Sequence, residues 1–344
     1  MLEIDGAHGE GGGQLLRTAV ALSAIRSVPI RIVRIRAGRP TPGLAAQHVA
    51  ALGAVAALCE GQVDGLEIGS QDVVFRPGAI VAGRHAFEVG TAGSATLVLQ
   101  ACLPVAFAAP GPVTLRIVGG TDVRWSPPID YFARVFLPLL HSMRGHVTLE
   151  VFRRGYYPRG GGVVEAAIEP VRGWGPLSLR ERAAMTRVRG IAHVANLPDH
   201  IPKRMKHAAM RRLHGFADIK IEERVYAGEE AVGQGGAVVL WAEAGPTILG
   251  ANSLAERGKS SERVGEEAAG SLRTEMESGA SLDIHASDQL VVYLALARET
   301  SEFLVREVSG HLATMTWLIP QFVPCSIRTS AQGPLWRVSV EPNH

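Results

Sequence analysis

The segment GEGGGQLLRTAVALSAIRSVPIRIVRIRAGR, residues 9–39, contains the structural unit that decides the fold. Glycines around a single acid open it, and the stretch that follows is rich in alanine, leucine and valine, which is typical of a helix. Pro29 ends that stretch, and the next residues are rich in valine and isoleucine, which predicts a strand. One helix and one strand cannot bury their own apolar faces, so the unit needs partners.

The same order of features occurs twice more along the chain. It appears in GTAGSATLVLQACLPVAFAAPGPVTLRIVGGTD at 90–122 and in HASDQLVVYLALARETSEFLVREVSGH at 285–311. We expect each strand to end at a glycine followed by a polar group, namely Arg39, Thr121 with Asp122, and His311. The chain is therefore predicted to be a mixed α/β (α+β) protein in which three repeated αβ units pack together.

Residues 185–278 differ in character from the repeats. They hold a basic amphipathic helix, two strand-like runs and a charged helix, at 201–216, 218–226, 235–244 and 261–279. We expect them to form a small αβ domain inserted into a large domain made of residues 1–184 and 279–340. The basic helix is compatible with a contact to nucleic acid, although a solvated surface face is the commoner explanation of its charges.

The composition is that of a globular chain with little excess charge. Apolar residues make up 47% of the 344 residues, and the net charge of +2 excludes a broad cationic surface of the histone kind. No apolar run reaches the roughly 18 to 20 residues that cross a bilayer, and the N-terminus lacks the basic start of a signal peptide, so we expect a cytoplasmic protein with no membrane partner. The cysteines stand far apart among apolar residues, which favours core thiols over disulfides or a zinc site: Cys59, Cys102 and Cys325.

A glycine-dense loop, GAHGEGGGQ at 6–14, leads directly into the first predicted helix. Glycines let backbone N–H groups approach a phosphate closely, and a helix start carries partial positive charge. Glu10 would repel that phosphate unless a divalent cation lay between them, which favours magnesium or manganese. The spacing fits neither the dinucleotide fingerprint nor the P-loop, and a tight turn without a ligand is the alternative.

Two further loops carry groups suited to a nucleotide. IRAGRPTPGLAAQH at 35–48 supplies Arg36 and Arg39, and arginine is suited to bidentate phosphate binding. GTDVRWSPPIDYF at 120–132 brings together an arginine, Trp125 and two prolines, as a nucleobase and its phosphate require. A packed loop followed by a proline-initiated helix is the alternative.

A lone imidazole, His311, follows the third predicted strand in GHLATMTWL, residues 310–318. A side chain at a strand end is held by a rigid element and is still free to face a cleft, which is a common way to mount a reacting group. A loop histidine that caps a nearby carbonyl is the alternative.

The most distinctive stretch is RRGYYPRGGGVV, residues 153–164, whose arginine-glycine pair, two tyrosines and triple glycine have no evident packing purpose. It resembles the signature of RNA 3′-terminal phosphate cyclases. Further blocks resemble that family and follow its order: DGAHGEGGGQLLRTA, IRAGRPTPGLAAQH, GTAGSATLVLQ, GGTDVRWSPPIDYF and SDQLVVYLALA.

This resemblance implies both a fold and a reaction. The implied fold is a large domain of three αβ units, similar to those of enolpyruvyl transferases, with a small αβ domain inserted before the last unit. The implied activity is an ATP-dependent ligase reaction that turns an RNA 3′-terminal phosphate into a 2′,3′-cyclic phosphate and releases AMP and diphosphate. It passes through a covalent histidine-AMP and an RNA-diphosphate-adenosine. The implied cofactors are ATP and Mg²⁺ or Mn²⁺, and the partner is an RNA 3′-phosphate end, with no obligate protein partner.

Matching the blocks residue by residue implies roles for single positions. His311 falls on the family's catalytic histidine and Glu10 on its metal-side position. The implied phosphate- and RNA-binding residues are Gln14, Arg17, Arg36, Arg39 and Gln47. The implied ATP- and adenosine-binding residues are Gln100, Pro127, Tyr131, His285, Asp288 and Gln289. Some members have a tyrosine where His285 stands, and an imidazole can still stack on adenine.

Three alternatives stay open at this point. The first is a non-catalytic relative that acts as a scaffold in ribosomal RNA processing, a branch that lacks the nucleophile that His311 would supply. The second is an enolpyruvyl-transferase-like enzyme, which would share the repeat and needs no covalent histidine. The third concerns the nucleophile itself, because His285 stands at a predicted helix start, where the dipole lowers the basicity of an imidazole.

Overall fold

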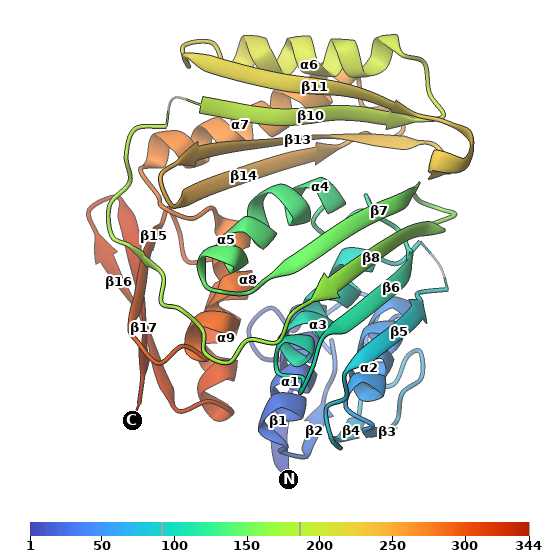
Figure 1. Ribbon diagram of the computed structural model, residues 1–344, viewed down its shortest axis with the longest axis vertical. Helices are drawn as coiled ribbons and strands as arrows, with labels where there is room; N and C mark the ends of the chain where they lie inside the picture. Colours follow the sequence, from blue (N-terminus) through green and yellow to red (C-terminus); the bar gives the residue numbers. More distant parts are fainter. Residues whose placement is uncertain (91, 186, 344) are drawn as a thin grey trace.

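The computed structural model describes residues 1–344 apart from residues 91, 186 and 344 (Figure 1). Three of its sheets share one strand order, in which the first two strands of a unit are parallel and the last two return antiparallel. The strands, in order of adjacency, are β1 (Leu2–Asp5), β2 (Ile30–Val33), β4 (Val73–Arg76) and β3 (Gln62–Asp64); β5 (Gly83–Glu88), β6 (Val113–Gly119), β8 (Gly162–Ile168) and β7 (Val147–Gly155); and β9 (Ser178–Leu179), β15 (Ser301–Val305), β17 (Leu335–Pro342) and β16 (Cys325–Gln332). This recurrence confirms the predicted fold class of three αβ units.

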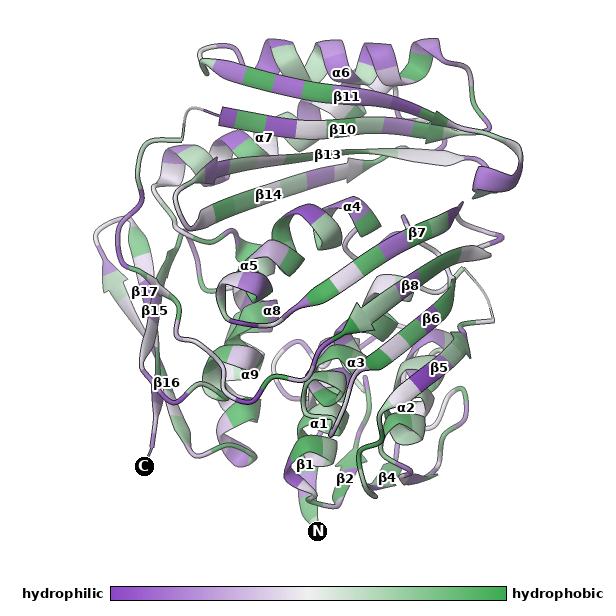
Figure 2. Ribbon diagram, viewed as in Figure 1, coloured by the Kyte–Doolittle hydropathy of each residue, from purple (hydrophilic) through white to green (hydrophobic). Residues whose placement is uncertain are grey.

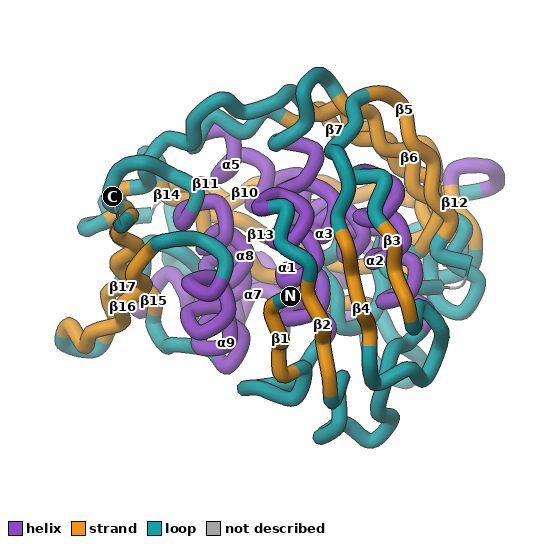
Figure 3. Tube along the Cα trace, turned by 90° about the horizontal axis from the view of Figure 1, so that it is seen from below, coloured by secondary structure: helices purple, strands orange, loops and turns teal. Residues whose placement is uncertain are grey.

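Helices connect the parallel strands and fill the centre of the molecule. A parallel pair needs a crossover connection, and the crossover helices are α1 (Gly13–Arg26), α3 (Ala95–Phe107) and α8 (Ile284–Ala295). The second helix of each unit is, in turn, α2 (Ala46–Leu58); the continuous run of α4 (Ile129–Tyr131), η1 (Phe132–Phe136) and α5 (Leu137–Ser142); and α9 (Gly310–Leu318), which ends in the short turn η3 (Ile319–Gln321). Figure 3 shows the helices gathered at the centre with the three sheets around them.

The central helices are apolar on nearly all sides because they are buried on all sides (Figure 2). One hydrophobic core runs through all three units. Every residue of α3 except Gln100 is buried. A polar side chain that interrupts such a helix has a particular neighbour to meet, and in this fold that neighbour lies on α8.

A fourth sheet of different strand order stands apart at the top of Figure 1. Its strands, in order of adjacency, are β11 (Asp218–Tyr226), β10 (Arg187–Ala195), β13 (Gly235–Ala244) and β14 (Thr247–Leu254), with the packed pair α6 (His200–Arg212) and α7 (Ser261–Ser278). These elements share a hydrophobic cluster that extends from Met185 to Met276. We propose that they form the inserted domain of residues 185–278. The short η2 (Gly228–Glu230) and β12 (Ala231–Val232) leave this sheet, and β12 pairs with β7.

Two of the three predicted strand ends are wrong. The strand β6 stops at Gly119 as expected, but β2 already ends at Val33, because Arg34 takes a left-handed backbone conformation (φ +53°) that breaks the strand. The strand β15 ends at Val305, and His311 lies in the first turn of α9 rather than at a strand end. Ser309 explains the helix, since its hydroxyl accepts a hydrogen bond from the backbone N–H of Leu312 at 3.1 Å.

Two expectations from composition can be compared with the structure. Cys59, Cys102 and Cys325 are all buried and unbridged, as predicted. Among the residues that the structure describes, no helix is both long and apolar enough to span a membrane.

The glycines of α7 predict opposite effects of the same substitution. A Cβ added to Gly265 would overlap the backbone carbonyl oxygen of Met205 where α6 and α7 cross, whereas a Cβ on Gly270 would have its nearest neighbour, an Arg212 side-chain nitrogen, at 3.8 Å. Gly265→Ala should therefore lower the free energy of unfolding by about 1–3 kcal/mol. Gly270→Ala should raise it by up to about 1 kcal/mol, because alanine is the better helix former.

Urea unfolding followed by circular dichroism measures both variants against the native chain. Equal unfolding midpoints for Gly265→Ala and the native chain would contradict the close crossing of α6 and α7.

Candidate active site

The glycine-rich loop and the start of α9 meet at Glu10 and His311. Gly9 and Gly11 adopt left-handed backbone conformations (φ +59° and +53°), which fold the loop tightly before α1. A Cβ on Gly310 would lie 2.5 Å from Oε1 of Glu10, so a larger residue would push the carboxylate away. This fit places Nδ1 of His311 3.2 Å from Oε2 of Glu10.

The surroundings of His311 favour its neutral form. Burial is the largest cause that holds the pKa of His311 below its ordinary value of 6.5. The neighbours that act in the same direction are Arg17, His285 and Arg39, and only the Glu10 carboxylate opposes them among the causes. With Nδ1 facing a carboxylate, the ring proton is assigned to Nδ1, which leaves the lone pair of Nε2 free.

Two of the three predicted phosphate-binding arginines, Arg17 and Arg39, lie near this pair, and the third, Arg36, holds the loop of Arg39. Arg39 donates a hydrogen bond from Nη2 to the backbone oxygen of Glu10 at 2.9 Å, and the same nitrogen lies 3.6 Å from Oε2 of Glu10. Arg36 donates from Nη1 to the carbonyl oxygen of Gly43 at 2.7 Å, which fixes the loop that carries Arg39. Burial lowers the pKa of Arg17 to about 10, so its guanidinium stays charged at neutral pH. The cations lie beside the starts of α1 and α9, whose dipoles add positive potential.

Five predicted residues line one small cavity between α1, α3 and α8. The cavity has a volume of about 30 Å³, which is room for a water-sized group, and its lining includes Gln14, Arg17, Gln100, Asp288 and Gln289. Gln14 donates from Nε2 to Oδ1 of Asp288 at 3.1 Å, and Gln100 donates from Nε2 to Oε1 of Gln289 at 2.6 Å. The structure therefore brings the first and third repeats together through polar side chains.

Two polar groups that line this cavity have unusual surroundings. Burial is the main cause that raises the pKa of Asp288 well above its ordinary value, which favours the neutral carboxyl. A neutral carboxyl does not repel a phosphate. The other polar atom of Gln14, its Oε1, is buried and has no hydrogen-bond partner among the described residues.

Tyr131 is buried and supports the site indirectly, through the aspartate that caps α8. It is 1% exposed, and its hydroxyl donates a hydrogen bond to Oδ1 of Asp283 at 2.7 Å. The same carboxylate oxygen caps α8 by accepting from the backbone N–H of His285 at 3.0 Å and of Ala286 at 2.9 Å. The ring of His285 is exposed, and its centroid lies 6.5 Å from that of Tyr131. An adenosine contact by Tyr131 stays a prediction, as does one by the half-buried Pro127.

Sequence reasoning passed over several residues that hold the site. The sequence-based prediction named Gln47, whose side chain forms no hydrogen bond among the described residues. Its neighbour His48 is buried and accepts a hydrogen bond at Nδ1 from the backbone N–H of Ala45 at 2.9 Å. Thr314 accepts from the backbone N–H of Glu10 at 3.4 Å and donates to the carbonyl oxygen of Gly310 at 2.7 Å. A threonine one turn after a helix cap is the only local signal for that role.

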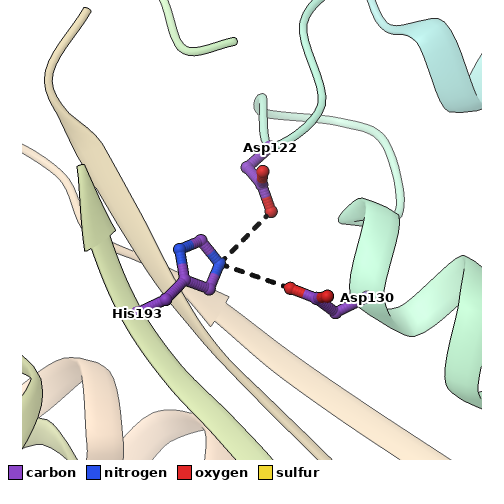
Figure 4. A group of neighbouring side chains, drawn as sticks. All are labelled: Asp122, Asp130 and His193. Carbon is purple, nitrogen blue, oxygen red and sulfur yellow. Dashed lines mark ion pairs between the residues drawn. The ribbon is translucent and has the colours of Figure 1, made fainter. Parts of the chain in front are cut away.

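The signature stretch has the packing purpose that its sequence did not reveal. Arg154 is 4% exposed and forms two hydrogen bonds of 2.8 Å to the Asp130 carboxylate, with Asp122 at 3.3 Å. Nε2 of His193, from β10, lies 3.5 Å from a carboxylate oxygen of each aspartate (Figure 4). Two carboxylates and an imidazole are potential metal ligands, but the guanidinium already supplies the positive charge there. Arg154 also donates to the hydroxyl of Tyr226 at 3.2 Å, so the network ties the fourth sheet to the second.

Comparisons with known proteins agree on one family. The model of the family described as RNA 3′-terminal phosphate cyclase matches residues 8–329. A protein of that name from Nitrosospira multiformis is 49% identical over 342 residues, covering 99% of this chain and 97% of its own length. Another from Methanopyrus kandleri is 44% identical over 348 residues, covering 99% of both chains. The enolpyruvyl transferase NikO from Streptomyces tendae is 11% identical with a TM-score of 0.27, covering 100% of this chain and 83% of its own, and a score this low carries no conclusion.

His48 predicts a specific pH dependence of stability. Burial, together with Arg17 and Arg36, lowers the pKa of His48 from 6.5 to about 3. Near pH 6.5 the unfolded chain therefore binds a proton at His48 that the folded chain does not bind. The contribution of the neutral His48 to the free energy of unfolding is complete above that pH and is lost as the pH falls. When the pH falls from 7 to 5, the free energy of unfolding should decrease in both proteins, and the decrease should be about 2 kcal/mol smaller for His48→Asn than for the native chain.

Urea unfolding at both pH values tests this, with the exposed His207→Asn as the matched control. If His48→Asn and the native chain lose equal stability on acidification, the buried neutral imidazole is disproved.

Proposed function

The chain belongs to the RNA 3′-terminal phosphate cyclase family, and from that premise we propose that it uses ATP to convert the 3′-terminal phosphate of an RNA into a 2′,3′-cyclic phosphate. The observation that carries the proposal is the position of His311. Its Nδ1 faces Glu10 at 3.2 Å, its Nε2 has no hydrogen-bond partner among the described residues, and arginines lie near it. This arrangement suits a nucleophile that attacks a phosphate.

In the first step the lone pair of Nε2 attacks the α-phosphorus of ATP. A nitrogen–phosphorus bond forms, the bond from that phosphorus to the oxygen bridging to the β-phosphate breaks, and pyrophosphate leaves with the electron pair. The imidazole keeps its Nδ1 proton, and the carboxylate of Glu10 stabilises the positive charge that the ring gains. Arg17 and Arg39 stabilise the negative charge on the phosphoryl oxygens.

In the second step an oxygen of the RNA 3′-phosphate attacks the adenylate phosphorus. The nitrogen–phosphorus bond breaks, His311 is regenerated, and the RNA end carries a diphosphate bridge to adenosine. The neighbouring 2′-hydroxyl then attacks the terminal RNA phosphorus, loses its proton and expels AMP, which closes the cyclic phosphate. Without activation the same attack would have to expel an oxide-like group, so ATP cleavage makes ring closure possible.

The residues present fit a divalent cation at Glu10. Magnesium typically takes one or two protein carboxylates and completes its shell with water and substrate phosphates. The Glu10 side chain is 37% exposed, and only its Oε2 faces His311, so Oε1 remains for a metal. A bound Mg²⁺ or Mn²⁺ would neutralise phosphate charge in this site.

The cavity between α1, α3 and α8 has room for one water-sized group, so it supports a single polar contact with ATP rather than the binding of the whole nucleotide. We place one polar group of the nucleotide against Gln100, Asp288 and Gln289, with the exposed ring of His285 available to stack on the adenine. Gln14 Oε1 would then find a donor on the ligand or on a water that comes with it. The scaffold alternative is less favoured, because a non-catalytic scaffold does not require an imidazole like that of His311, oriented by the carboxylate of Glu10.

Removal of the His311 imidazole should abolish covalent labelling. With Mg²⁺ and ATP labelled on the α-phosphate, the native chain should form an acid-labile adduct that survives denaturation, and His311→Ala should form none. His285→Ala should still form the adduct at high ATP concentration, because its ring only contacts the base in this account. Label that persists in His311→Ala but disappears in His285→Ala would reassign the nucleophile, and an unlabelled native chain would favour the scaffold.

Glu10→Gln should slow adduct formation by about 10- to 100-fold, because the variant loses a metal ligand and the charge that supports the imidazole. Raising the Mg²⁺ or Mn²⁺ concentration should restore part of the rate. Glu3→Gln removes an exposed acid on β1 and serves as the control. Labelling of Glu10→Gln at the native rate would refute both roles of the carboxylate.

A further inference from the structure

We propose that Trp125 and Tyr157 form a stacking platform for the single-stranded RNA that precedes the reacting 3′-phosphate. The inference rests on the proposed function, because it names the residues that hold the substrate of that reaction. Neither side chain has a part in the steps described above. Both lie on loops that the sequence marked as unusual.

Exposure is the first observation. Trp125 is 92% exposed and Tyr157 is 77% exposed, more than any other large hydrophobic side chain that the structure describes. Folding gains nothing from an aromatic ring that stays in water. Aromatic rings displayed in this way are what unstacked nucleobases bind, each stacked base contributing about 1–3 kcal/mol whatever its identity.

The second observation is that both loops are anchored at their roots. Asp122 forms a parallel bridge with Tyr156, and the backbone N–H of Thr121 donates to the carbonyl oxygen of Gly155 at 2.8 Å. Arg154 holds the same point through its hydrogen bond to the Asp122 carboxylate at 3.3 Å. Trp125 stands three residues beyond one root and Tyr157 one residue beyond the other, so both rings extend from one rigid base.

The backbone at Trp125 supports the same conclusion. Its φ of +65° lies in the left-handed region, which is costly for a bulky residue. The hydroxyl of Ser126 closes the turn by donating to the carbonyl oxygen of Val123 at 2.9 Å. An indole held outward against a backbone cost is preorganised, and a preorganised side chain loses little entropy when it binds.

Charge favours a nucleic acid as the occupant. Arg124, next to the indole, forms a two-pronged pair with Glu256 at 2.8 and 2.7 Å, which joins the loop between β14 and α7 to this surface. Arg159 and Arg257 are both exposed on the same loops. Exposed arginines interleaved with two aromatic rings match a strand of alternating phosphates and bases.

The platform is also connected to the proposed ATP site. Two residues after the indole, the carbonyl oxygen of Pro127 accepts from the hydroxyl of Thr96 in the first turn of α3, at 2.8 Å. The chain then enters α4, where Tyr131 reaches the Asp283 cap of α8. A strand stacked on Trp125 would therefore lie beside the starts of α3 and α8.

The test uses the full chain, a short oligoribonucleotide with a 3′-phosphate, and the variants Trp125→Ala and Trp125→Phe. Trp336→Ala, which removes a partly exposed indole on β17, is the matched control. We expect Trp125→Ala to raise the KM for the oligoribonucleotide about tenfold with little change in kcat at saturation, and Trp125→Phe to restore most of the difference. RNA should also quench the tryptophan fluorescence of the native chain and of Trp336→Ala, but much less that of Trp125→Ala.

Covalent labelling with ATP alone tests the proposed function separately from the stacking platform. A native chain that neither labels nor cyclises RNA would end the proposed function. A native chain that does both, while Trp125→Ala has the native KM for RNA and the native quenching, would overturn the platform alone. A change in kcat without a change in KM for RNA would also overturn it, since that pattern belongs to a distorted site.

Discussion

The proposed reaction depends on one constraint, a histidine that must be neutral and must present a particular ring nitrogen to the phosphate. Burial and neighbouring cations lower the pKa of His311 and so favour its uncharged form, while the carboxylate of Glu10, 3.2 Å from Nδ1, favours the proton on that nitrogen. The two influences act in opposite directions on the pKa of His311, and together they determine how its ring is oriented. The glycines on both sides of the pair are a consequence, since a Cβ on Gly310 would displace Glu10.

The threefold repeat supplies the surroundings of that pair. Each unit places a buried crossover helix at the centre; the first of these, α1, follows the loop that carries Glu10, and His311 lies in the first turn of α9. Because each helix start carries partial positive charge, the repeat itself builds a region suited to phosphate, to which Arg17 and Arg39 add full charges. Gln100, the only residue of α3 that is not buried, reaches Gln289 on α8 and so brings the second unit into the same region.

The buried arginine network serves the fold at a distance from the chemistry. Arg154 holds Asp130, whose neighbour Tyr131 hydrogen-bonds the cap of α8, and it also reaches His193 and Tyr226 in the fourth sheet. An arginine without these partners would leave a buried charge unpaired, which is strongly destabilising. The signature stretch therefore has a structural explanation at Arg154, and its exposed part, Tyr157, is left for binding.

Local patterns in the sequence revealed the elements better than the contacts between them. The strands at 218–226 and 235–244 and the glycine loop around Glu10 follow directly from composition and spacing. The helix at His311 was missed even though Ser309 is a typical cap, because the preceding strand pattern was extended too far. The structural role of His48 was missed, since a helix turn decides which of two neighbours faces inward, and the binding role of Gln47 stays a prediction. The partners of Arg154 come from residues 122, 130 and 193, and no local pattern can connect positions so far apart in the chain.

The most direct test of the account asks which ring nitrogen carries AMP. The chain would be prepared with ¹⁵N-labelled histidine rings, reacted with ATP and Mg²⁺, and examined for phosphorus–nitrogen coupling in the adduct. The account predicts coupling to Nε2 of His311, with Nδ1 still protonated. Coupling to Nδ1, or an adduct on any other residue, would contradict it.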